Sequence, residues 1–205
     1  ISENRGVNPL VGLLAEGNEN AQKYASDALI RLATDNPENQ AQIAKKLVSL
    51  LDYDDANVVS RAAHDLQALA QDHPGAPVVI VSAGAISPLV TVLSNGKTDE
   101  GRQEAAKTLA TLANSGSANQ LAIAVGLVAL LGVGTDQAQE YVTKLLLDLS
   151  SGLEEDLENR KAIANAGPFK MLVAQLGSQS TQVRVLAVAV MSKLAGDTPE
   201  NIEQI

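Results

Sequence analysis

An apolar block that returns five times constrains the fold of this chain more than any other feature. It reads PLVGLL at 9–14, KLVSLL at 46–51, PLVTVL at 88–93, GLVALL at 126–131 and MLVAQL at 171–176. A second block begins 14 or 15 residues after the first Leu of each copy, giving segments at 24–33, 61–70, 104–113, 141–150 and 186–195. A recurring period of about 40 residues is typical of stacked structural repeats.

Each block has the spacing of an amphipathic helix. In the first copy of the second block, apolar or small residues recur four residues apart in two adjacent rows: Tyr24, Ala28 and Leu32, and Ala25, Leu29 and Ala33. Polar stretches with Gly, Asn and Asp separate the blocks, as expected where a chain reverses. Two such helices cannot bury their apolar stripes alone, so neighbouring repeats must stack. The sequence therefore predicts an all-α solenoid of about five repeats.

An isoleucine marks one point of every cycle: Ile1, Ile43, Ile80, Ile123, Ile163 and Ile205. These positions divide a single solenoid over 1–205 into repeats at about 1–42, 43–79, 80–122, 123–162 and 163–205. The linker from Ile to the next block alternates between long forms with Gly and short forms, which predicts that three-helix repeats alternate with repeats whose first helix is shortened or merged. Because the chain begins and ends at the same phase, we expect further repeats in a longer array.

Composition excludes several classes of function. The net charge of −9 argues against nucleic acid as a partner, since phosphate binding relies on clustered Lys and Arg. The longest apolar runs are too short for a membrane-spanning helix, so no membrane partner is expected. With no Cys, two His and no nucleophile motif, the sequence predicts no catalytic residue, no metal site and no cofactor.

Three phrases, PENQ at 37–40, AGAISPLVTVL at 83–93 and EAAKTLATLA at 104–113, are similar to those of the armadillo-repeat family. The resemblance covers the whole chain, and HEAT repeats are a near relative of its short-linker repeats. It implies a right-handed α-α superhelix whose third helices line a concave groove that binds an extended peptide or another protein. In the nuclear-import adaptors of this family, the third helices carry a Trp and, four residues on, an Asn. The matching positions here are Asp27, His64, Lys107, Lys144 and Ala189, then Arg31, Ala68, Thr111, Asp148 and Lys193. None is Trp or Asn, so the clamp for basic localisation peptides is not implied.

These ten residues are the candidate partner-binding surface. Four of them are positive and two are negative, which predicts a mildly basic groove for an acidic or phosphorylated segment; the alternative is that six solvated charges happen to sum this way. The expected function is a non-enzymatic protein-interaction scaffold, located in the cytoplasm or the nucleus.

Two other functions stay open at this point. One is a structural segment of a long solenoid that associates end to end with its own neighbours. The other is a HEAT-like lyase or enzyme-accessory subunit, which needs a polar cluster on adjacent helices; His64 with Arg61 or Lys107 comes nearest. Tyr24 and Tyr141 occupy matching positions and are expected to pack between helices. An acidic insertion at 150–163 is expected to lengthen a connection.

Overall fold

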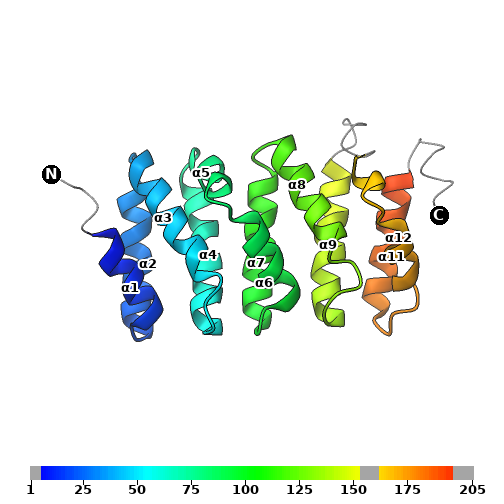
Figure 1. Cartoon of the computed structure of the whole chain (residues 1–205), viewed down its shortest axis with the longest axis horizontal. Coiled ribbons are helices and arrows are strands. Elements are labelled where there is room, and N and C mark those ends of the chain that lie inside the picture. Colours follow the sequence, from blue (N-terminus) through cyan, green and yellow to red (C-terminus); the bar gives the residue numbers. More distant parts are fainter. Residues whose placement is uncertain (1–5, 153–161, 196–205) are drawn as a thin grey trace.

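The structure, a computed structural model, describes residues 6–152 and 162–195, and its regular elements there are helices arranged in two layers (Figure 1). Five long helices stand side by side, and we call them the third helices: α2 (Glu19–Ala33), α4 (Ala56–Asp72), α7 (Asp99–Ala113), α9 (Asp136–Gly152) and α12 (Thr181–Ala195). The second layer holds α1 (Val7–Glu16), α3 (Pro37–Leu50), α5 (Ala76–Ser82), α6 (Ile86–Asn95), α8 (Ser117–Val128) and α11 (Phe169–Gln175). The predicted all-α solenoid is confirmed.

Each third helix begins five residues before the apolar block that predicted it, and a capping side chain directly precedes its first residue. An oxygen of the cap accepts a backbone N–H of the first turn, and the five caps are Asn18, Asp55, Thr98, Thr135 and Ser180. Such a cap satisfies one of the donors that a helix start leaves unpaired. Because cap and block keep one offset, equivalent residues face the same way in all five repeats.

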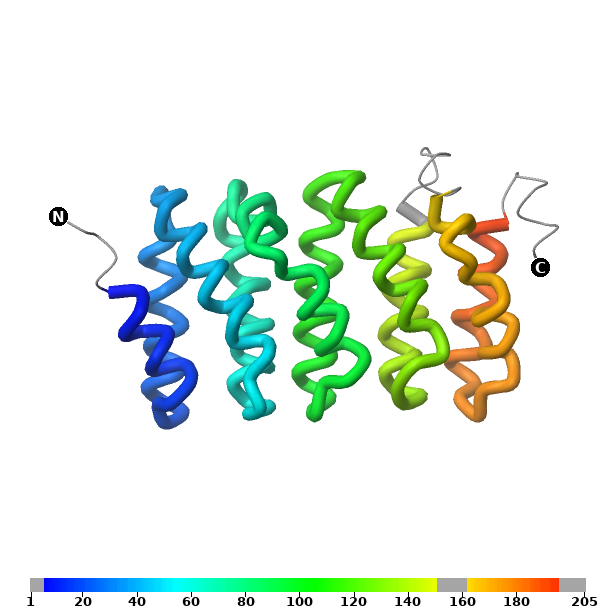
Figure 2. The backbone as a smooth tube through the Cα atoms, viewed as in Figure 1, coloured from blue at the N-terminus to red at the C-terminus, as the bar shows by residue number. Residues whose placement is uncertain are grey.

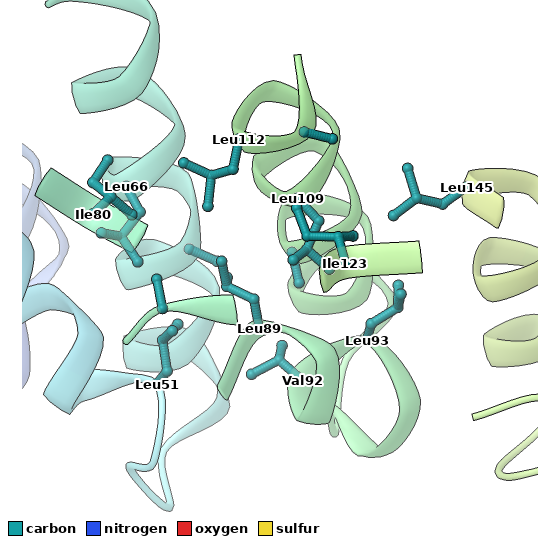
Figure 3. Close-up of a cluster of buried hydrophobic side chains, with 14 of the residues drawn as sticks. Leu51, Leu66, Ile80, Leu89, Val92, Leu93, Leu109, Leu112, Ile123 and Leu145 are labelled. Carbon is teal, nitrogen blue, oxygen red and sulfur yellow. The ribbon is translucent and has the colours of Figure 1, made fainter. Parts of the chain in front are cut away.

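The core between the two layers is made of small and aliphatic side chains. Side chains from several helices gather in one cluster (Figure 3), where Leu66 of α4, Leu89 of α6 and Leu109 of α7 are fully buried. The marker isoleucines Ile43, Ile80, Ile123 and Ile163 are fully buried as well. Recurring burial of one residue type at one phase explains the periodicity of the sequence.

The predicted alternation between two kinds of repeat is present. In the second and fourth repeats a single straight helix, α3 or α8, runs obliquely from one third helix to the next (Figure 2). In the third repeat the chain forms α5 and α6, whose axes are bent by 80° at a short break. Gly84 lies in that break with φ of 83°, and Gly167 holds φ of 80° at the matching point before α11. This left-handed backbone favours glycine.

The contact between consecutive third helices, which we call a junction, alternates with the repeat type. The close junctions, α4–α7 and α9–α12, pack over more of the helix length than the open junctions, α2–α4 and α7–α9. Both open junctions are bridged by a straight helix, α3 or α8. A straight oblique helix advances along the solenoid as it crosses, so it delivers the chain farther from the preceding third helix.

The structure tests the predicted repeat boundaries only in part, because some of the residues involved lie outside the described ranges. Ile43, Ile80 and Ile123 lie inside α3, α5 and α8, so the spacing of the isoleucines marks phase rather than the start of a helix. Most of the acidic insertion and the C-terminal stretch 196–205, on which the expectation of flanking repeats depends, lie outside the described residues.

Among the described residues, no single helix is long and apolar enough to cross a membrane; only the bent pair α5 and α6 reaches that length and composition together.

Candidate functional site

The ten predicted binding residues lie on the third helices, two on each, and all are exposed or half-buried. We call the surface that they share the third-helix face. Residues at i and i+4 of one helix lie on the same side, so each helix contributes two neighbouring positions. The structure places these side chains in one repeating ladder; their contact with a partner stays a prediction.

Glu104 of α7 changes the charge of this face. Its side chain is 11% exposed and lies between two predicted residues. One oxygen accepts a hydrogen bond from Lys107 Nζ at 2.7 Å, and the other lies 3.4 Å from His64 Nδ1 on α4. Lys107 is therefore paired within the protein. The sequence sum left out Glu104 and overstated the positive charge at this point.

A buried polar pair joins the two helices of the α2–α4 junction. Asp65 of α4 is 1% exposed, and its two oxygens lie 2.7 and 2.6 Å from the hydroxyl of Ser26 on α2. Burial raises the pKa of Asp65 to about 6. The hydrogen bond from Ser26 and the nearby charges of His64 and Arg61 oppose that rise but do not cancel it.

A second polar contact closes the same junction at the other end of α4. His73 is buried, and its Nε2 lies 3.1 Å from the carbonyl oxygen of Ile30; since a carbonyl only accepts, the ring nitrogen donates. Beside it is an open cavity of about 600 Å³, which Arg31 also lines. No pattern in the sequence singled out His73 for this contact.

The α7–α9 junction holds a cavity of about 230 Å³ instead of a polar pair. Leu145 of α9 is buried in it, and Ala106 and Ala110 of α7 are half-buried, so the deep part is apolar. Three predicted residues form its exposed rim: Lys107, Lys144 and Asp148. The sequence prediction thus named the rim of this cavity but not its floor.

Tyr141 forms one wall of the cavity and is half-buried. Partial burial, followed by the charge of Asp99 and a hydrogen bond to it, raises the pKa of the Tyr141 hydroxyl. Packing between helices is confirmed for Tyr141. It is wrong for Tyr24, which is 70% exposed, because this position faces the preceding third helix and α2 has none among the described residues.

A buried hydrogen bond joins the two helices of the α4–α7 junction. The Thr108 hydroxyl of α7 donates to the Ala63 carbonyl of α4 at 2.9 Å, and both residues are fully buried. Glu104 also lies at this junction: it forms an ion pair with Lys107 on its own helix, and its other oxygen is 3.4 Å from His64 Nδ1 on α4. Among the described residues, no three His, Asp or Glu side chains gather as metal ligands would.

The C-terminal end of the stack exposes positions that are buried elsewhere. Leu176 is 39% exposed, whereas its equivalents Leu14, Leu51, Leu93 and Leu131 are buried. Val188 of α12 is 53% exposed and corresponds to Ser26 and Thr143, whose hydroxyls bond to the following repeat. The end face thus has the composition of a stacking surface.

Comparison with known proteins shows the fold and leaves the ligand open. No family model and no curated protein matches the sequence. A solved engineered protein is 29% identical, with a TM-score of 0.64 over 97% of this chain and 83% of its own. A designed armadillo repeat protein in complex with the peptide (KR)4 is 21% identical, with a TM-score of 0.62 over 97% and 85%. A structure of computationally designed armadillo repeat proteins for modular peptide recognition is 21% identical, with a TM-score of 0.61 over 97% of this chain and 86% of its own. The chain has an armadillo-type repeat fold.

Proposed function

We propose that this armadillo-type solenoid is a non-enzymatic scaffold that binds an extended peptide or protein segment along its third-helix face. The observation that carries the proposal is the ladder of equivalent accessible side chains on five neighbouring helices. An extended backbone also repeats at short intervals, so it can meet successive rungs of such a ladder. Solved designed proteins of the same fold support the proposal, since one is in complex with a peptide.

The segment is acidic at the points where it crosses Arg31 and Lys144. Both side chains are exposed on the third-helix face, and Lys144 lies at the rim of the α7–α9 cavity. Lys107 contributes less than the sequence suggested, because Glu104 already binds its Nζ. Carboxylates or phosphates of the partner would pair with Arg31 and Lys144, and salt would weaken the pairing.

Selection of random ten-residue peptides on the intact chain tests this function. Acidic peptides should be enriched, and their affinity should fall about tenfold in the variant with Arg31→Glu and Lys144→Glu together, since opposite charges become like charges. Lys45→Glu on α3 is the matched control, because Lys45 is an exposed cation of the other layer. If the double variant binds as the wild type does, or if the control loses as much, the charged face is not the binding surface.

End-to-end association is a second candidate function, favoured by the exposed apolar end face of Leu176 and Val188. Stacking through positions that pack repeats together inside the chain would bury this surface. Light scattering over a range of concentrations should then show masses above one chain, and Val188→Lys should restore one chain. A single mass at all concentrations would exclude this candidate.

A further inference from the structure

The cavity at the α7–α9 junction differs in chemistry from the matching place at the α2–α4 junction. Its deep part is formed by Ala106, Ala110 and Leu145, without a buried charge. At the α2–α4 junction the positions of Ala106 and Leu145 are held by Ser26 and Asp65, which bond to each other. The two open junctions thus share a geometry and differ in what fills it.

Two of the polar side chains around this cavity, Lys107 and Tyr141, are already engaged by the protein. Lys107 Nζ bonds to Glu104 at 2.7 Å, and the Tyr141 hydroxyl interacts with Asp99. Lys107 therefore presents its aliphatic stem to the cavity, and Tyr141 presents its ring. A charged ligand group entering here would lose its hydration without finding a free counter-charge on the floor.

The volume fits one side chain of a peptide. About 230 Å³ holds several waters, at about 30 Å³ each in the liquid. Waters against Leu145 and the two alanines have few partners, and an apolar group that displaces them gains the burial of its own surface. The cavity is open to solvent along the rim, so the group can enter from an extended backbone lying across it.

The rim supplies contacts for that backbone. Lys144 and Asp148 lie one turn apart on α9 and are both exposed. Lys144 offers hydrogen-bond donors and Asp148 offers acceptors, and a backbone amide group of the partner can bond to one of each. A backbone held here would direct one side chain into the cavity.

We propose that the α7–α9 cavity is the specificity pocket of the third-helix face and takes one aliphatic or aromatic side chain of the bound segment. The proposal rests on the proposed function, because it assigns one position of the segment that the face binds. Filling the cavity from within should then compete with the ligand. Ala110→Leu and Ala106→Leu each place three more carbon atoms in it.

The experiment uses the ten-residue peptides selected on the intact wild-type chain. They should share one apolar position, and each filled variant should bind them at least tenfold more weakly. Ala15→Leu on α1 is the matched control, since Ala15 is a half-buried alanine of the second layer outside both the third-helix face and the cavity, and it should change affinity less than twofold. Changing the shared apolar residue of the peptide to Asp should cost as much as filling the cavity.

A second measurement does not depend on the folding of a variant. A photoreactive benzoylphenylalanine at the shared apolar position of the peptide should cross-link to 103–110 or 141–148 of the wild-type chain. Cross-links elsewhere, no shared apolar position, or equal binding by the filled variants would each overturn the pocket while leaving peptide binding in place. Failure to enrich any peptide above an unrelated helical protein would instead overturn the proposed function, and the pocket with it.

Discussion

The two open junctions, α2–α4 and α7–α9, are built on the same plan and filled in opposite ways. Each is bridged by a straight helix of the second layer and lies two repeats from the other. In the first, Ser26 and Asp65 meet in a buried hydrogen bond; in the second, Ala106 and Leu145 lie in a cavity. The comparison teaches that helix lengths and linkers set the spacing of the third helices, whereas two residues per junction decide whether a buried polar pair or an apolar cavity lies at that place.

Transferring the polar pair to the second junction should have the largest effect on stability. Ala106→Ser with Leu145→Asp removes a buried Leu and brings in a carboxyl group, so the free energy of unfolding at pH 7 should fall by about 5 kcal/mol. Urea unfolding measures the loss. Lys144→Ala, an exposed neighbour on α9, should change stability by less than about 0.5 kcal/mol. A loss near that of the control would mean that the two junctions are interchangeable.

The reverse change at the first junction should stabilise the protein. Asp65→Asn keeps an oxygen that accepts from Ser26 and removes the buried charge. The rise of the pKa of Asp65 from 3.8 to about 6 corresponds to a loss of about 3 kcal/mol in the free energy of unfolding above pH 6. Thermal unfolding at pH 7 should show a higher midpoint. Asp27→Asn on the exposed side of α2 serves as the control, and an equal gain there would assign the effect to net charge instead.

The same carboxyl group predicts the pH dependence of the wild type. Below pH 3.8 Asp65 holds its proton in both the folded and the unfolded chain, so burial costs nothing. Between pH 3.8 and about 6 the unfolded chain releases the proton first, and the contribution of Asp65 makes stability fall as pH rises. Urea titrations at several pH values should show this fall in the wild type relative to Asp65→Asn. Parallel curves would contradict it.

Removal of one hydrogen bond tests the α4–α7 junction. Thr108→Val deletes the hydroxyl that donates to the Ala63 carbonyl and leaves that buried oxygen without this donor, at a cost of about 1.5 kcal/mol. Thr111→Val on the same helix deletes a hydroxyl that bonds only within α7, and it should cost under about 0.5 kcal/mol. Equal losses in urea unfolding would mean that the contact between the helices adds nothing.

Two glycines compare the room for a methyl group in the second layer and at a close junction, and these changes should have the smallest effects. Gly126 lies inside α8, where an added Cβ would be 3.5 Å from Val90 Cγ2, an ordinary contact, so Gly126→Ala should raise stability by about 0.8 kcal/mol. Gly101 faces α4 at the close junction, and a Cβ there would be 3.0 Å from Ser60 Oγ. Gly101→Ala should therefore stabilise less or destabilise, as thermal unfolding would show; an equal gain would refute the difference in spacing.

The repeats, the helices and the ladder of ten residues could be predicted because they depend on periodicity, which one sequence displays. The alternation of repeat types was visible in linker length alone. Glu104 and Asp65 were missed as parts of the face because they lie three residues before and one residue after the aligned position, where the helix turns toward its neighbour. What they contact depends on the distance between third helices, and that distance is set by helices of the other layer.

The alternation of straight and bent connections has a consequence for how such a chain can grow. Leu47 and Leu127, which begin matching blocks in the two repeats with straight helices, are 80 residues apart, and one repeat with a bend lies between them. The module of construction is therefore a pair. An insertion or deletion of two repeats would preserve the alternation of open and close junctions. An insertion or deletion of one repeat would place two connections of the same kind in succession, and every binding position of the third-helix face beyond it would move by one repeat.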